Sequence, residues 1–479
     1  MNPNALSGLI FVLVFAGVVL IHEFGHYIVS LLFKVEVEEF GIGLPPRAWK
    51  LWRNKGYFML GDQRIEIPAN FDRSHDWYKV QGKECKITVD RVDDKYVLQS
   101  IEYVEIEVKK PTRSDISVGR IEVNEKGGTV QPAQNEQATI TKNVKAGAGD
   151  GDIKLSGVVN ELHPGTDFTL NWLPLGGFVR PKGENDPAIK GGLAAASPWA
   201  RLAVLFAGPT MNLLAGVVVF SFLFTQIGIP DFNKVQVNSV LPDSPASQAG
   251  LKEGDQIVSI NGETPTTTQQ TRAIIYSHLD QPLHFVVARG GEQVELTATP
   301  LSARTAEQGA LGIQMGPVFV QPKNFFAALP YGALETYAQA RMLISLPAQM
   351  LRGAISPEEG RFIGLKGIYD LFGQAVNRDV QSRETIEATP SAPKPQAPSF
   401  YTLQLIAILT VSIGLFNLFP FPALDGGRIM FVLPEIITRR RVPAKFENYV
   451  HGIGMTILLL FMIYVNVMDF INPAQVTLP

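Results

Sequence analysis

The sequence predicts a polytopic α-helical membrane protein with about four transmembrane helices, a β-rich insertion and a compact α/β domain outside the membrane. Three observations lead to this prediction. Four long apolar stretches interrupt a chain of 479 residues. Charged residues make up only 18 % of the chain, against about 25 % in a typical soluble domain. The polar regions between the apolar stretches show the alternating or turn-rich patterns of small β-containing domains.

Composition narrows the class of protein further. The formal net charge of −3 gives no electrostatic basis for binding nucleic acid. The single cysteine, Cys85, excludes an intrachain disulfide framework and a zinc site built from cysteines. The content of 43 glycines and 33 prolines is high, but far from that of a collagen or a low-complexity chain. The composition gives no indication of an oligomeric state.

Each apolar stretch is long enough, or nearly long enough, to span a bilayer. A hydrocarbon core of about 30 Å needs roughly 20 helical residues. The expected spans are residues 6–33, 202–224, 403–419 and 453–468, of which the last two are near the lower limit. Residues 1–8 contain no Lys or Arg, so the first stretch is predicted to be a retained helix rather than a cleaved signal peptide.

Basic residues predict how these helices are oriented, because cytoplasmic loops are enriched in Lys and Arg. Lys34 and Arg47 follow the first span, and Arg439, Arg440 and Lys445 lie between the third and the fourth. Both loops are therefore expected in the cytoplasm. The termini and the segment between the second and third spans are expected on the opposite side.

The chain is predicted to divide into eight segments. Alternation of apolar and polar residues, as over 101–108, indicates strands before the second span. The segments are the first spanning helix with the start of a strand region, residues 1–53; a β-rich cytoplasmic insertion, 54–169; a hairpin segment, 170–200; the second spanning helix, 201–230; the α/β domain, 231–303; an amphipathic helical region, 304–376; a flexible linker rich in Pro, Ser, Thr and Glu, 377–400; and the third and fourth spanning helices, 401–479.

A five-residue motif in the first span indicates a metal site. Residues four apart share one face of a helix, so His22 and His26 of the sequence His-Glu-Phe-Gly-His can present two imidazoles to one ion. Glu23 lies beside them, placed to act on a water at the metal. This pattern also arises by chance in soluble proteins. At membrane depth, however, ionisable residues are costly and usually face a polar cavity, so the motif is predicted to bind a metal.

A catalytic zinc site needs a third protein ligand. The candidate is Asp425, in the sequence N-L-F-P-F-P-A-L-D-G-G-R of residues 417–428 at the end of the third span. Asp425 can instead cap the helix that follows, since Gly426 and Gly427 would accommodate such a turn. From the residues alone, the two roles have equal weight.

Together the two motifs resemble the paired signature of the site-2 protease family of intramembrane zinc metalloproteases. The resemblance implies that His22, His26 and Asp425 bind Zn²⁺ and that Glu23 is the general base. It also implies that Asn417 holds the substrate backbone near the metal.

Further segments extend the resemblance. The turn residues of 241–263 resemble those of a PDZ domain of the bacterial protease type, and residues 208–212 resemble a motif of the family's second helix. Leu175, Gly176 and Gly177 match a membrane-associated hairpin and are expected to bind substrate. With one PDZ-like α/β domain, the arrangement is closest to the RseP-type branch, whose best-known member has two. The β-rich insertion lies outside the resemblance.

The resulting hypothesis is an intramembrane zinc endopeptidase of the bacterial inner membrane, with its PDZ-like domain on the extracytoplasmic side. Its expected substrates are transmembrane segments of single-pass proteins, such as an anti-sigma factor or a signal-peptide remnant. Two alternatives remain, a proteolytically silent membrane PDZ scaffold and a metal transporter that uses the same three ligands. The intact Glu23 argues against the scaffold, and the lack of repeated halves in the sequence argues against the transporter.

Overall fold

The computed structural model of the protein describes most of the chain, and the described part forms two compact units. The described residues are 3–71, 80–106, 139–145, 153–184, 186–303, 309–354, 361–388 and 399–473. Unit A consists of residues 12–211 and 417–459, and unit B of residues 1–11, 212–416 and 460–479.

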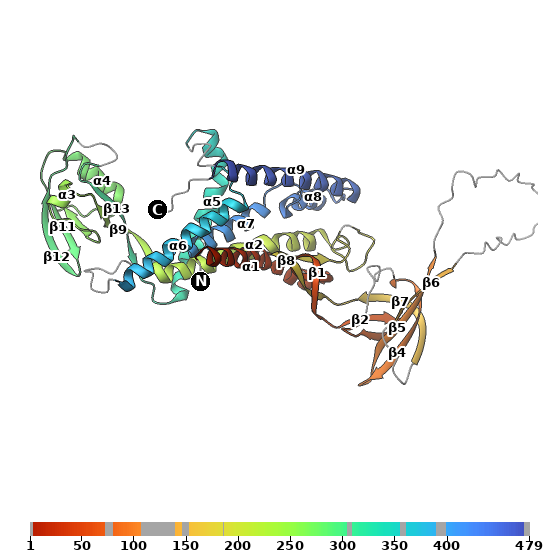
Figure 1. Cartoon of the computed structure of the whole chain (residues 1–479). Coiled ribbons are helices and arrows are strands. Elements are labelled where there is room, and N and C mark those ends of the chain that lie inside the picture. The colour runs from red at the N-terminus through yellow and green to blue at the C-terminus, as the bar shows by residue number, and fades with distance from the viewer. Residues whose placement is uncertain are drawn as a thin grey trace, which may run out of the picture. The chain divides into compact units, whose positions relative to one another are not determined.

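Helices and strands occur in both units (Figure 1). The helices are α1 (Pro3–Leu32), α2 (Pro198–Ile227), α3 (Pro245–Gln248), α4 (Thr268–Ser277), α5 (Phe325–Leu351), α6 (Leu365–Ala388), α7 (Tyr401–Asn417), α8 (Asp425–Thr438) and α9 (Ala444–Ile471). The strands are β1 (Val37–Arg53), β2 (Gly56–Leu60), β3 (Gln63–Ile67), β4 (Glu84–Val92), β5 (Lys95–Ile106), β6 (Thr139–Lys145), β7 (Ile153–His163), β8 (Asp167–Pro181), β9 (Ile229–Val240), β10 (Gln256–Ile260), β11 (Leu283–Arg289), β12 (Glu292–Ala298) and β13 (Ile313–Val320).

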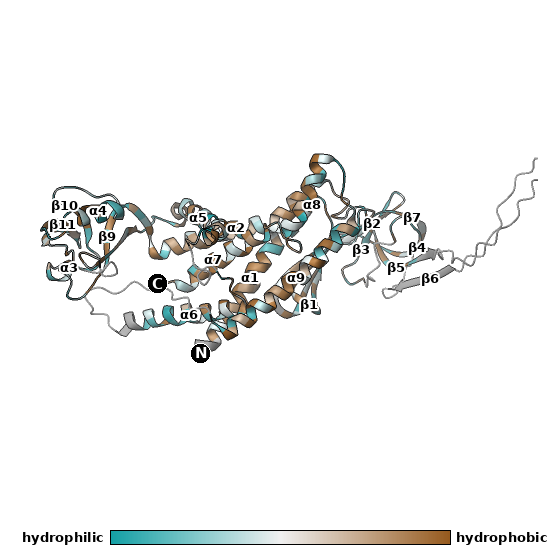
Figure 2. Ribbon diagram, turned by 90° about the horizontal axis from the view of Figure 1, so that it is seen from above, coloured by the Kyte–Doolittle hydropathy of each residue, from teal (hydrophilic) through white to brown (hydrophobic). Residues whose placement is uncertain are grey.

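Among the described residues, three helices are long and apolar enough to cross a membrane, as expected of a membrane protein. They are Leu6–Leu32 in α1, Pro198–Ile227 in α2 and Ala444–Ile471 in α9. Figure 2 shows hydrophobic residues along these helices, in contrast to the largely hydrophilic α6. The remaining expected span, residues 403–419, corresponds to α7, which has 17 residues and lies at the lower limit of the length a span requires.

In unit A, β1 and β8 form a small sheet that packs against α1. Both strands bend, β1 at two successive prolines, so that they supply four extended segments. Residues 37–44 pair on one side with 177–181 and on the other with 167–173, which in turn pair with 47–53. The order across the sheet is therefore 177–181, 37–44, 167–173 and 47–53. Residues 177–181 and 47–53 are its two edges.

The β-rich insertion connects residues 47–53 of β1 to residues 167–173 of β8. These two segments are neighbours in the sheet, so a hairpin turn could join them in its place. β1 ends at Arg53 and β8 begins at Asp167, and the N–H of Asn54 donates to the carbonyl of Thr166 at 3.0 Å. The sheet thus begins three residues before the predicted end of the insertion at residue 169. The predicted boundary was late because the pairing of 167–169 with β1 is a long-range contact that the local pattern does not reveal.

The insertion forms a small β-barrel. Its strands have the order β3-β2-β7-β4-β5-β6, and a parallel pairing of β3 with β5 closes the first five (Figure 1). Phe58, Ile65 and Leu98 belong to its buried core. Cys85 lies in the same core, and burial raises the pKa of its thiol to about 11. Residues 72–79, 107–138 and 146–152 of the predicted insertion lie outside the described residues.

Buried charges join the barrel to the sheet. The ammonium of Lys182 is 3.0 Å from Oε2 of Glu36 and donates to the carbonyl of Leu162 at the end of β7. Nδ1 of His163 lies 3.1 Å from the other oxygen of Glu36. Burial raises the pKa of the Glu36 carboxyl, and the Lys182 ammonium opposes this shift. The insertion is therefore attached by an ion cluster as well as by the two chain crossings.

In unit B, a five-stranded sheet of order β12-β11-β10-β9-β13 forms the predicted α/β domain with α3 and α4. Val235, Ile257 and Phe285 lie in its buried core. The sheet extends beyond the predicted domain end at residue 303, because β13 pairs with β9 and completes it. The sequence predicts an amphipathic helical region here instead, since a short edge strand whose partner is far away in the chain leaves little local signal.

The predicted flexible linker, residues 377–400, begins as helix, because α6 continues to Ala388. Asp379 on α6 accepts the N–H groups of Tyr401 and Thr402, at 2.9 and 3.0 Å, and so caps the start of α7. This contact between helices favours helix in a segment whose composition suggested a coil. Residues 389–398 of the predicted linker lie outside the described residues.

Candidate metal centre

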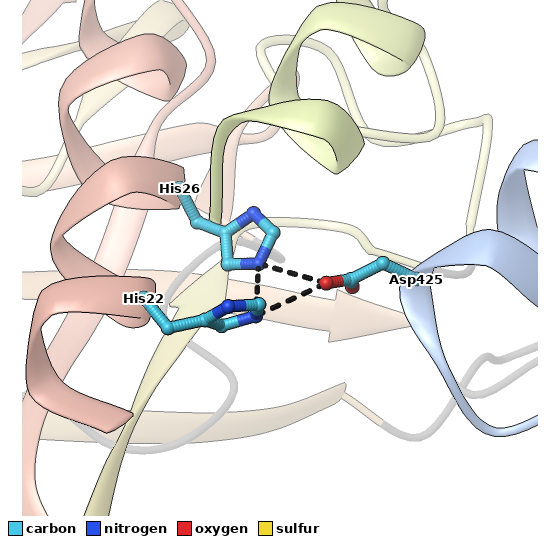
Figure 3. A group of neighbouring side chains, drawn as sticks. All are labelled: His22, His26 and Asp425. Carbon is cyan, nitrogen blue, oxygen red and sulfur yellow. Dashed lines mark hydrogen bonds and ion pairs between the residues drawn. The ribbon is translucent and has the colours of Figure 1, made fainter. Parts of the chain in front are cut away.

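Two histidines on successive turns of α1 point toward the first residue of α8 (Figure 3). Nε2 of His22 and Nε2 of His26 are 3.1 Å apart. Oδ2 of Asp425 is 3.1 Å from Nε2 of His22 and 3.3 Å from Nε2 of His26. The three side chains are 8 %, 12 % and 19 % exposed. All of these residues belong to unit A, so α1 and α8 bring together groups that are about 400 positions apart in the chain.

The segment before α8 directs Asp425 into this cluster. The N-cap of α8 is Leu424, which makes no side-chain cap hydrogen bond, and Asp425 is the first helical residue. The capping role that the sequence left open is therefore not the one observed. The N–H of Ala423, whose φ is +89°, donates to Nδ1 of His451 at 3.0 Å. This bond from α9 fixes the residue at which the chain turns into α8.

The donor set fits a zinc ion. Two imidazole nitrogens and one carboxylate oxygen are ligands that zinc prefers, and three protein ligands leave a fourth position open. With bonds of about 2.0–2.1 Å, the ligands of a tetrahedral zinc are about 3.3 Å apart, close to the separations seen here. Nδ1 of His26 lies 2.7 Å from the carbonyl of Val204, which can only accept. The proton therefore resides on Nδ1, and the lone pair of Nε2 faces the cluster.

A glycine of α2 leaves room at this site. A Cβ on Gly208 would lie 2.7 Å from Nε2 of His22 and still closer to Nε2 of His26, the two nitrogens that would bind a metal. Gly25 of α1 also allows a close approach of the two helices, because a Cβ there would lie 2.5 Å from the carbonyl oxygen of Ala207 in α2. In the sequence, Gly208 is recognisable only as part of a motif. A glycine inside a long apolar helix, where it lowers helix stability, was the available signal.

Glu23, one residue after His22, contacts the β1–β8 sheet. Its Oε2 accepts the backbone N–H of Val179 in β8 at 2.9 Å. Hydrogen bonding to a backbone amide was not predicted, because it depends on no particular side chain at residue 179.

The predicted substrate-contacting residues lie in the same unit. Gly176 brings β8 close to α1 and Gly177 brings it close to β1: a Cβ on Gly176 would lie 3.1 Å from the side chain of Val19, and one on Gly177 would lie 2.8 Å from the carbonyl of Gly41. Leu175 is in β8, but its side chain lies outside what the structure describes. Asn417 is the last residue of α7 and is partly buried. Contact of these residues with substrate stays a prediction.

Comparison with known proteins identifies the family. The sequence model of peptidase family M50 matches residues 10–61 and 155–461, and the gap between the two matched ranges falls within the insertion. The chain belongs to peptidase family M50. The resemblance to the site-2 proteases is therefore confirmed, and this M50 protein is a zinc metalloprotease.

Individual relatives agree with this assignment. The M50 protein is 27 % identical to the zinc metalloprotease RasP of Oceanobacillus iheyensis, over 95 % of this chain and 96 % of the relative. It is 31 % identical to a putative zinc metalloprotease of Clostridium perfringens, over 64 % of this chain and 84 % of the relative. A solved PDZ domain from an SdrC-like protein of Listeria monocytogenes aligns with 24 % identity over 19 % of this chain and 90 % of that domain, with a TM-score of 0.16.

Proposed function

We propose that this M50 protein is an intramembrane endopeptidase in which His22, His26 and Asp425 hold zinc and Glu23 is the general base. The observation that carries the proposal is the cluster of three ligand atoms, 3.1–3.3 Å apart, on a helix apolar enough to span a bilayer. The proposed substrates are transmembrane segments of single-pass proteins, including anti-sigma factors or signal-peptide remnants, cleaved in regulated intramembrane proteolysis.

The chain's own residues account for the rest of the chemistry. Bound zinc would supply a Lewis acid for the scissile carbonyl. Glu23 accepts a proton from the attacking water as the new C–O bond forms, and returns it to the leaving amine as the C–N bond breaks. A helical substrate shields its carbonyls by internal hydrogen bonds, so it must be extended before attack. The edge segment 177–181 of β8 offers a strand to pair with, and Asn417 is proposed to hold another part of the substrate backbone.

We propose the bacterial inner membrane as its location, with the PDZ-like domain on the extracytoplasmic side. The basic residues 439–441 lie between α8 and α9, and such residues mark cytoplasmic loops. The relatives described above are bacterial proteins. The lipid bilayer is therefore the proposed environment of α1, α2 and α9.

We further propose that the PDZ-like domain restricts which substrates reach the metal. A domain attached directly to α2 can exclude substrates with bulky outer domains without any sequence preference. One observation favours a second role, capture of an extended peptide. A cavity of about 320 Å³ is lined by Arg272 and Tyr276 of α4 and by residues 309–315, and β13 is an edge strand.

Deletion of residues 231–320, replaced by a short linker, distinguishes these roles. Exclusion predicts that substrates with intact outer domains are then cleaved. Capture predicts that full-length substrates stay uncut and that shortened ones are cleaved more slowly.

The decisive experiment on the chemistry compares wild type with Glu23→Gln and Asp425→Ala during co-expression with single-pass substrates. Glu23→Gln is expected to keep its zinc and lose cleavage, because the ligands remain while the base is gone. Asp425→Ala is expected to lose both. A silent scaffold or a metal transporter would show no cleavage even as wild type. A transporter would instead lose zinc transport in Asp425→Ala. Full activity of Asp425→Ala would refute the assignment of the third ligand.

A further inference from the structure

The edge of the β1–β8 sheet nearest the metal centre is already occupied by a catalytic side chain. Segment 177–181 pairs on one side with residues 37–44, and within the described part of the chain no strand pairs with its other side. Oε2 of Glu23 accepts the backbone N–H of Val179 from this segment at 2.9 Å. The proposed general base thus takes a hydrogen bond that a pairing strand would otherwise take.

The contact is built into the packing of β8 on α1. Gly177 lies so close to α1 that a Cβ there would be 3.6 Å from the side chain of Leu20 and 3.9 Å from Cγ of Glu23. Val179 itself packs in the cluster of Tyr27, Val37 and Phe40, which joins α1 to the sheet. The N–H of Val179 is therefore held within reach of Glu23 by the fold.

We propose that a substrate strand added at this edge displaces Glu23 from the N–H of Val179 and thereby frees the carboxylate to accept the proton of the attacking water. This inference rests on the proposed function. A strand that pairs with residues 177–181 uses every second backbone amide of the segment, including that of Val179. A substrate carbonyl then takes the amide, and Oε2 of Glu23 turns to the water.

The exchange conserves hydrogen bonds, so it has little net cost. The Val179 amide has an acceptor before and after, first Glu23 and then a substrate carbonyl. The carboxylate exchanges an amide for a water, so one hydrogen bond to the charged group is present before and after the exchange. Without substrate, Oε2 of Glu23 is engaged by the Val179 amide. The base becomes available only when an extended chain lies beside it, which couples hydrolysis to correct presentation of the substrate.

The test removes the N–H of residue 179 and leaves Glu23 in place. Val179→Pro lacks this N–H, and proline is tolerated on an edge strand whose N–H faces outward. The matched control, Val179→Ala, keeps the N–H. Cleavage of an extended, detergent-soluble peptide is measured for kcat and KM, and zinc per chain is measured for each variant.

The proposal predicts a split between the two constants. In Val179→Pro, a substrate carbonyl loses its partner, so KM should rise about fivefold, the effect of one net hydrogen bond. kcat should stay within twofold of wild type, because Glu23 is free in the bound state of both proteins. Val179→Ala loses side-chain packing but keeps the N–H, so its rise in KM should be much smaller than that of Val179→Pro, and all three proteins should carry equal zinc.

Two results would overturn the exchange. A fall in kcat at unchanged KM would mean that the amide of Val179 orients Glu23 throughout the reaction. Unchanged kcat and KM would mean that substrate does not use this amide. If Val179→Pro does not fold, replacing Val179 by α-hydroxyisovaleric acid removes the same N–H with the side chain kept. Cleavage by wild type and its loss in Glu23→Gln establish the proposed function separately, so either result would leave that function standing.

Discussion

Replacing Gly208 by alanine tests whether α2 leaves the space that the proposed metal ligands His22 and His26 occupy. The new Cβ would lie 2.7 Å from Nε2 of His22, where side-chain carbons are essentially never found below 3.0 Å. Reaching an ordinary contact of 3.4 Å requires a shift of about 0.7 Å. The bonds of a zinc site tolerate deviations of only about 0.2 Å. Nε2 of His26 is closer still, so both imidazoles must move.

We therefore expect Gly208→Ala to bind zinc on the order of 100-fold more weakly than wild type, which is the upper range for losing even an outer-shell partner. The assay is zinc per chain in the purified protein after dialysis against a graded chelator, with substrate cleavage measured on the same samples. Gly17→Ala is the matched control, because a Cβ on Gly17 of α1 would meet nothing within 4 Å.

Residue 208 also precedes Pro209, and a Cβ before proline is disfavoured in helical conformation. The double variant Gly208→Ala/Pro209→Ala removes that conflict and keeps the Cβ. It should remain deficient in zinc. Zinc content and cleavage equal to wild type in Gly208→Ala would refute the reasoning, and recovery of zinc in the double variant would assign the defect to the proline.

Other predictions concern the insertion and the topology. Because the pKa of Cys85 is about 11, its alkylation at pH 8 should be on the order of 100-fold slower in folded than in denatured protein, and equal rates would contradict the barrel core. Lys182→Met should lower stability by about 3 kcal/mol, because it leaves Glu36 without its buried cation, and Lys182→Met/Glu36→Gln should recover much of the loss in thermal unfolding. A topology reporter inserted in residues 439–445 should lie in the cytoplasm, and one inserted in residues 389–398 should lie on the opposite side of the membrane. The reverse pattern would contradict the orientation predicted from the basic residues.

The metal motif was readable from the sequence because helix geometry is local. Residues four apart share a face, so His22 and His26 had to present their imidazoles together once α1 formed. The pairing of this motif with the segment around Asp425 led to the family, which comparison confirmed. The barrel and the α/β domain were also legible as β-containing units, because alternation and turn residues act within a few positions.

Boundaries were less predictable, because they depend on partners far away in the chain. Residues 167–169 were assigned to the insertion, yet they pair with β1, and β13 was assigned to a helical region, yet it completes a sheet. The end of α6 is predicted as linker from sequence because residues 377–400 are rich in Pro, Ser, Thr and Glu. Its Asp379 instead caps α7, a contact between two helices that composition does not reveal.

The sequence alone shows which functional groups are available: two imidazoles and a carboxylate on one helix, a second acid after a predicted helix break, and apolar stretches long enough to span a membrane. The tertiary structure was needed to show that Asp425 lies 3.1 Å from His22 and that Leu424, not Asp425, is the N-cap of α8, because both arrangements are locally possible. The same holds for Gly208 and Val179, which act through an absent side chain and a backbone N–H. Neither leaves a chemical signature in the sequence, because space and backbone direction exist only once the helices and strands have packed.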